Sequence, residues 1–105
     1  MLALAKELKR DKAWELAGQI TDAAISSTAN IAEGFGRFHY QENIQFCRIS
    51  RGSLHELMDH QSTALDEKHI TDSDYGRYRA ECELAIKLVN GYIRMLRTRK
   101  AASDQ

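Results

Sequence analysis

The sequence has no proline, only two cysteines and no net charge. Without proline, helices can run long without kinks, and loops lack a residue that commonly punctuates sheet proteins. The two cysteines, Cys47 and Cys82, lie far apart and match neither a disulfide framework nor a metal-binding spacing. Fifteen basic residues balance fifteen acidic ones, so overall charge gives no argument for binding nucleic acid or a membrane. Any such role has to rest on local clusters.

Long apolar runs are also missing. No segment approaches the length of a membrane span, and the opening residues MLALAKELKRDK become charged too early for a secretory signal. We therefore expect a cytoplasmic protein with no membrane contact. Hydrophobic residues make up 43% of the chain and charged residues 29%, which is typical of a folded chain. The length suits a single domain, residues 1–105.

Apolar residues recur every three or four positions over three segments, which predicts three long helices. These helices are expected at 13–35, 41–65 and 71–98. Thr71 is well placed to cap the last of them, because its hydroxyl can accept a hydrogen bond from a free backbone N–H. Residues 1–12 predict a short N-terminal helical stub. The last five residues, from Ala101 to Gln105, are expected to fray.

The joints between the long helices, at about 36–40 and 66–70, are short, so neighbouring helices should run antiparallel. We predict an all-α fold, an antiparallel up-and-down bundle of the four-helix type with a shortened first helix. Gly34 and Gly36 are expected to end a helix in the left-handed conformation. Gly52 lies within a helix, where it costs about 1 kcal/mol relative to alanine, and this predicts the close approach of another helix.

The usual signals for an enzyme are absent. A di-metal carboxylate bundle needs two Glu-x-x-His motifs, because that spacing puts two ligands on one helical face. Glu56 and His60 form one pair at a spacing of four, and no second pair answers them. Cys47 and Cys82 differ in predicted height by about 10 Å along the bundle, too far for a disulfide, and are expected to be buried thiols. We expect no cofactor, no metal and no catalytic activity.

Basic residues form an early cluster at residues 6–12 and a late cluster at residues 94–100. The antiparallel path places Arg37 at the same end as the late cluster. The candidate nucleic-acid contacts are therefore Arg37, Arg94, Arg97, Arg99 and Lys100. Positive charge near a helix C-terminus also interacts favourably with the helix itself. Both interpretations of the late cluster stay open.

One string supports a resemblance to a known family. Residues 30–37 read NIAEGFGR, and the strings GSL and EL follow at residues 52–54 and 56–57. Over about residues 15–97 the chain resembles the bacterial four-helix-bundle proteins encoded in intervening sequences of 23S rRNA genes. The resemblance implies a ring-like homo-oligomer, commonly a pentamer, without enzymatic activity. A related group, the accessory proteins of diversity-generating retroelements, binds nucleic acid and a reverse transcriptase.

The polar residues of the resembling segments are candidates for a structural network or an interface. They are Asn30, Glu33, Arg37, Glu42 and Glu56. The first three follow each other at spacings of three and four, so they can form one polar edge. This edge serves either as a hydrogen-bond network within or between subunits, or as a contact surface for a partner.

Three helices with wide apolar faces leave one groove uncovered, to be filled by the stub or by another subunit. The groove predicts an oligomer, and together with the resemblance and the basic clusters it predicts a non-catalytic oligomeric bundle associated with nucleic acid or ribosomal RNA. The alternative is a protein-interaction scaffold without nucleic-acid contact. The candidate partners are further copies of the chain, RNA or DNA, and a protein such as a reverse transcriptase.

Overall fold

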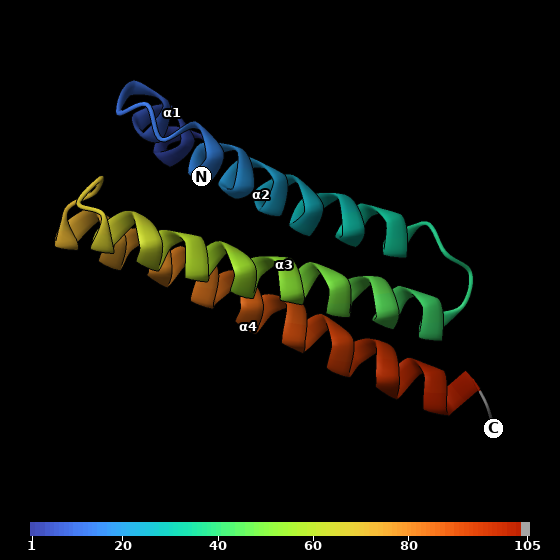
Figure 1. Cartoon of the computed structure of the whole chain (residues 1–105). Helices are drawn as coiled ribbons and strands as arrows, with labels where there is room; N and C mark the ends of the chain where they lie inside the picture. The colour runs from blue at the N-terminus through green and yellow to red at the C-terminus, as the bar shows by residue number, and fades with distance from the viewer. Residues whose placement is uncertain (104–105) are drawn as a thin grey trace.

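The computed structural model describes residues 1–103, which form four helices and no strand (Figure 1). The helices are α1 (Leu2–Arg10), α2 (Trp14–Phe35), α3 (Tyr40–Asp66) and α4 (Asp72–Ser103). The predicted all-α class with a short first helix is confirmed. Helix α4 runs five residues beyond the expected end at 98, so the expected fraying is wrong for residues 101–103. Residues 104–105 lie outside the described part.

Helix α3 is the centre of the arrangement. Helices α2 and α4 lie on either side of it and run antiparallel to it, and α1 folds back against the start of α2 (Figure 1). The molecule is an elongated rod of 55 × 21 × 16 Å. Because both connections at the ends of α3 are short, each end of the rod gathers residues that are far apart in the sequence.

The apolar interior divides into two cores along the rod. Near the α1 end, the fully buried Leu4 and Leu8 pack with side chains of all three long helices. Towards the other end, a second core is built around Ile44 and Ile93 of α3 and α4, and α1 takes no part in it. The stub therefore covers only one half of the groove between α2 and α4.

The other half of this groove is open. It forms an apolar hollow of about 330 Å³ lined by Ile31, Phe35, Leu88, Val89 and Tyr92. Phe35 is 76% exposed and Leu88 is 65% exposed. We call this hollow the open groove. Large apolar side chains gathered at one such place are a feature of surfaces that bind a partner.

Buried serines fix the register of α2 against α3. The Ser50 hydroxyl donates a 2.6 Å hydrogen bond to the Ser27 carbonyl, and the Ser26 and Ser53 hydroxyls share one of 2.8 Å. Small side chains let the two helices approach closely, and each hydroxyl finds a partner across the contact. Buried polar groups that are paired in this way hold one alignment and penalise others, since a shift would leave them unsatisfied.

Longer polar side chains fix α4 against α3. Asn43 donates a 3.0 Å hydrogen bond to the Tyr92 hydroxyl, and Arg51 donates one of 2.7 Å to Asn90. Farther along, Gln61 donates to the sulfur of Cys82 at 3.3 Å. These hydrogen bonds fix the antiparallel register of α4 against α3.

The helix ends confirm one capping prediction and correct another. The Asp74 backbone N–H donates a 3.1 Å hydrogen bond to the Thr71 hydroxyl, so Thr71 caps α4 as predicted. Gly36 ends α2 with φ −79°, and no described glycine has positive φ. The expected left-handed ending at Gly34 or Gly36 is therefore wrong. The helix ends instead with a right-handed residue.

The glycines inside the helices differ in their surroundings. A Cβ added at Gly52 would meet no described atom within 4 Å, so the predicted close approach of a helix at Gly52 does not occur within this chain. A Cβ at Gly34 would lie 2.7 Å from Asn43 Oδ1 and 2.8 Å from Phe46 Cβ. Close approach of helices therefore takes place at Gly34, where α2 meets α3.

Replacing Gly34 with alanine should destabilise the fold. The added methyl group would press on Asn43, whose amide bonds to Tyr92, and overpacking of this kind costs about 1–3 kcal/mol. Urea denaturation followed by circular dichroism measures the effect. Gly18→Ala in the same helix is the control, since a Cβ there meets no atom within 4 Å, and it should stabilise by about 0.5–1 kcal/mol. Equal stability of the two variants would contradict the close contact.

Candidate nucleic-acid interface

One end of the rod collects basic residues from two separate parts of the chain. The α2–α3 connection and the C-terminal end of α4 lie together at this end (Figure 1). The surrounding segments, residues 33–48 and 94–103, hold six arginines or lysines and two glutamates. The structure thus places Arg37 and the late cluster at the same end, as the antiparallel path predicted. We call this the basic end.

Two adjoining hollows form the surface of the basic end. The first, about 290 Å³, lies between the start of α3 and the end of α4, and its lining includes Arg48, Arg97 and Lys100. The second, about 610 Å³, is lined by the α2–α3 connection, with Phe38 and His39, and by the end of α4. Gln41 and Lys100 line both hollows. We call them the basic hollow and the aromatic hollow.

The arginines of the late cluster are exposed, and among the described residues their charges are not neutralised locally. Within residues 1–103, no acidic side chain pairs with Arg94, Arg97 or Arg99. All three are exposed to solvent. Their charges are therefore available to an external anion.

Arg37 is occupied within the protein. Its guanidinium lies 2.6 Å from a carboxylate oxygen of Glu33 and 3.8 Å from one of Glu42. It also stacks over the ring of Phe46, 5.0 Å from the centroid. The interactions join the end of α2 to the start of α3, so Arg37 braces the connection that carries Phe38.

The expected polar edge forms only in part. Glu33 and Arg37 pair, but Asn30 turns instead to Ser26, donating to its carbonyl at 2.8 Å and to its hydroxyl at 3.1 Å. Glu56 lies away from this group and is 3.3 Å from His60. The residues Asn30, Glu33, Arg37, Glu42 and Glu56 therefore do not converge on one point. Asn30, Glu33 and Arg37 form local bonds along α2 and its end.

Histidines and acidic residues form no metal-binding cluster. Among the described residues, no group of three or more His, Cys, Asp or Glu side chains could hold a metal ion. His69 bonds to Asp11 at 3.0 Å and lies 3.4 Å from Glu67. His69 thus links the α1–α2 connection to the α3–α4 connection, which is a structural role.

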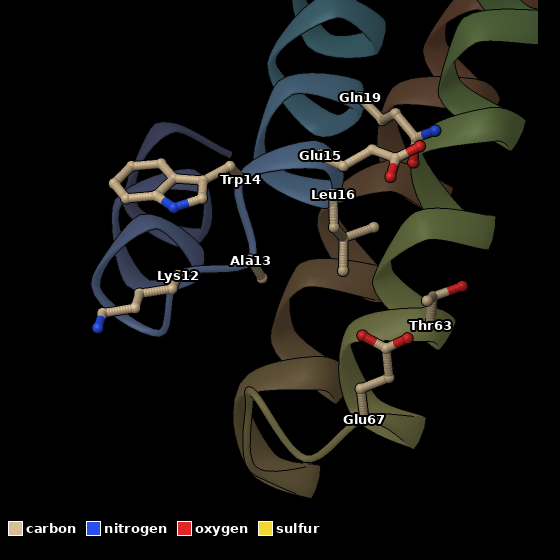
Figure 2. Close-up of a pocket in the computed structure, with 8 residues that line it drawn as sticks. All are labelled: Lys12, Ala13, Trp14, Glu15, Leu16, Gln19, Thr63 and Glu67. Atoms are coloured by element: carbon tan, nitrogen blue, oxygen red, sulfur yellow. The ribbon is translucent and has the colours of Figure 1, made fainter.

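A further hollow lies at the opposite end of the rod, beside the α1–α2 joint (Figure 2). It has a volume of about 500 Å³ and is lined by Lys12, Trp14, Glu15 and Glu67 among others. Figure 2 shows Lys12 and the indole of Trp14 on the side away from the two carboxylates. Its functional groups point apart, so this hollow has no converging set of ligand-binding groups.

Sequence reasoning missed three residues of the basic end, Arg48, Phe38 and Gln41. Arg48 is separated from the late cluster by almost fifty residues of sequence, and only the register of α3 against α4 brings it beside Arg97. The available signal was the spacing of Gln41, Ile44 and Arg48, which puts them on one side of α3. Phe38 falls outside every periodic segment, so helical patterning gives no indication of its position.

Comparison with known proteins adds one finding. Residues 1–91 match the model of a family described as 23S rRNA-intervening sequence protein. The chain belongs to this family. The match begins at residue 1, so it includes α1, whereas the resemblance drawn from the sequence began at about residue 15. Arg94 to Lys100 lie beyond the matched residues. No curated protein and no solved structure matches the chain.

No helix within residues 1–103 combines the length and the apolar character needed to cross a membrane.

The two cysteines lie in the interior and form no disulfide, as predicted. Burial raises the pKa of the Cys47 thiol, and it raises the pKa of Cys82 more than the hydrogen bond from Gln61 lowers it. A raised pKa reduces the thiolate fraction, and the thiolate is the nucleophile. These thiols therefore lack the activation that a catalytic cysteine needs.

Both cysteines should react slowly with a chromogenic aromatic disulfide while the protein is folded. At about pH 8 the folded chain should react at least about tenfold more slowly than the chain in urea, because burial limits access and keeps the thiols protonated. The pKa of each thiol is higher in the folded state than in the unfolded state. The stability that the protonated thiols contribute is therefore fully present below the unfolded pKa and is lost as the pH rises through the folded pKa. Absorbance of the released thiolate measures the rate. Equal rates in both states would show that the cysteines are accessible.

Proposed function

We propose that this chain is a non-catalytic, oligomeric helical bundle of the cytoplasm that associates with RNA, ribosomal RNA included, through its basic end. The carrying observation is that the fold places Arg48 beside Arg97, which pairs with no acidic side chain within residues 1–103, in a chain with no net charge. Phosphate contacts by Lys and Arg supply most of the affinity in sequence-independent binding. The basic end has the charge and the exposure for such contacts.

Family membership is compatible with an association with ribosomal RNA, since the family is described by its relation to 23S rRNA. The late cluster lies outside the matched residues. It therefore supports the proposal independently, through charge placement alone. Neither hollow of the basic end contains a buried nucleophile or a group that could hold a metal, which favours binding over catalysis.

Replacing Arg94, Arg97 and Arg99 with alanine should weaken RNA binding and flatten its salt dependence. Each lost phosphate contact lowers the slope of log K against log salt by roughly 0.7–0.9. Three contacts would therefore lower the slope by about 2–3. Fluorescence anisotropy of a labelled RNA between about 50 and 200 mM salt measures both quantities.

The matched control removes three charges from the other part of the same helix, with Arg77, Arg79 and Lys87 changed to alanine. Arg77 and Arg79 already pair with Asp74 and Glu83, and none of the three lies at the basic end. This variant should bind RNA nearly as well as the unchanged chain. If both variants lose the same affinity, the binding follows total charge, and the basic end has no special role.

A second candidate function is a protein-interaction scaffold, and the open groove favours it. The lining of the groove is apolar over its whole surface, and α1 stops short of it. The partner in the groove would be a second copy of the chain or a protein such as a reverse transcriptase. Its binding would cover Phe35 and Leu88. Because this groove and the basic end are different surfaces, the two functions are compatible.

Leu88→Gln should dissociate an oligomer held through the open groove. Leu88 is exposed in the single chain, so the change should leave the fold intact while it removes apolar area from the contact. Lys87→Gln at the adjacent exposed position is the control. Analytical ultracentrifugation at micromolar concentration should show smaller particles for the leucine variant alone. Unchanged mass for both variants would exclude this groove as the subunit contact.

A further inference from the structure

The basic end carries an exposed aromatic side chain, Phe38, in the hollow that adjoins the one lined by Arg48 and Arg97. We infer that the aromatic and basic hollows together bind an unpaired nucleotide of a single strand, with a base stacked on Phe38 and its phosphate beside Arg48 and Arg97. This inference rests on the proposed RNA association and adds the form of nucleic acid that is bound.

Phe38 makes almost no contact within the chain. Its side chain is 99% exposed, the highest value among the exposed large hydrophobic residues. It stands in the four-residue connection between α2 and α3, flanked by the exposed His39 and the partly buried Tyr40. An aromatic ring held out on a short connection between two packed helices can be covered by a nucleobase, because every base offers a flat face for stacking.

The connection that carries Phe38 is held by interactions on both sides. Arg37 bridges Glu33 of α2 and Glu42 of α3 and covers the ring of Phe46. Gly34 allows α2 to reach α3 closely just before the connection. The backbone that carries Phe38 is therefore held against α3 before any ligand arrives, which lowers the entropic cost of ordering the connection on binding.

The two hollows are arranged so that one nucleotide can occupy both. Gln41 and Lys100 line the basic hollow and the aromatic hollow alike, so the two spaces adjoin. Arg48 and Arg97 approach the basic hollow from α3 and α4. In the aromatic hollow, the Gln41 amide and the Glu42 carboxylate can offer a donor and acceptors to the edge of a base.

This arrangement favours a single strand over a duplex. In a duplex each base is stacked on both faces, so its flat surface cannot cover Phe38 without being flipped out of the helix. The charge cluster alone would accept the phosphates of either form. Discrimination between the two forms should therefore come from Phe38, and affinity for both should come from the arginines.

The test compares two labelled RNAs by fluorescence anisotropy with the full chain. One is oligo(U) of about 12 nucleotides, and the other is the same strand paired with oligo(A). Phe38→Ala should weaken binding of the single strand by about five- to a hundredfold and leave duplex binding unchanged. Phe38→Tyr should retain the affinity, since tyrosine offers the same ring.

Phe35→Ala is the matched control. Phe35 is another exposed phenylalanine near this end of the molecule, but it lines the open groove and neither of the two hollows. Its loss should leave binding of the single strand unchanged. An equal loss for both phenylalanine variants would overturn the inference, because it would show a general effect of surface apolar area.

A spectroscopic measurement tests stacking directly. The chain has one tryptophan, Trp14, which lies at the opposite end of the rod. In the variant that combines Trp14→Phe with Phe38→Trp, the only indole stands at the site, and oligo(U) should quench its fluorescence. The fluorescence of Trp14 in the unchanged chain should stay constant. Binding of oligo(U) without any quenching at position 38 would overturn the inference.

The outcomes separate this inference from the proposed function. If single strand and duplex both bind, lose affinity in the triple-arginine variant and are unaffected by Phe38→Ala, RNA association stands and the stacking site is excluded. If neither RNA binds the unchanged chain, the proposed function fails and the stacking site fails with it. If Phe38→Ala weakens binding of the single strand alone, the result supports both the RNA association and the stacking site.

Discussion

The register of the three long helices depends on hydrogen bonds buried along α3. Ser50 and Gln61 have almost no exposed surface, and each finds its partner on a different neighbouring helix. Apolar packing alone tolerates small shifts of one helix along another. A shift along α3 would leave buried polar groups without hydrogen-bond partners. This alignment brings Arg48 beside Arg97, so the basic end depends on pairs that lie well inside the rod.

The two halves of the rod are built differently. Where α1 is present, Leu4 and Leu8 complete a core among four helices. Where α1 is absent, three helices share a core whose outer rim, with Phe35 and Leu88, stays exposed. The half that lacks a fourth helix is also the half that carries the basic end. Both surfaces with a proposed binding role therefore lie in the part of the fold with the less complete core.

Much of the architecture could be predicted from the sequence because it follows from local rules. The three- and four-residue spacing of apolar residues located the long helices, and Thr71 caps α4 as a threonine at that position should. The glycines were harder to interpret. Gly34 marks a close helix contact and Gly52 does not, although both lie within helices. Which glycine meets a neighbour depends on the rotation of each helix about its axis, a property of tertiary packing.

The candidate site was only half predictable for the same reason. The late arginines could be found because they are adjacent in sequence, and the antiparallel path placed them near Arg37. The availability of each charge could not be foreseen, since Arg37 is paired with Glu33 and Glu42, while Arg97 stays unpaired among the described residues. Phe38 shows the limit most clearly, because an aromatic residue in a short connection can equally be buried or exposed.

A chain with fifteen charges of each sign has no net charge to attract it to a polyanion. Its charges are, however, unevenly distributed along the rod. Within residues 1–103 the positive excess sits at one tip of a rod 55 Å long, and the remainder carries a negative excess, with twelve acidic and nine basic residues. Such a particle behaves as a permanent electric dipole, so the field of a polyanion exerts a torque that turns the basic tip forward. Salt confines this torque, like the attraction of the basic tip, to separations of about one Debye length, 8–10 Å. The isoelectric point, at about 6.9, gives no sign of this behaviour.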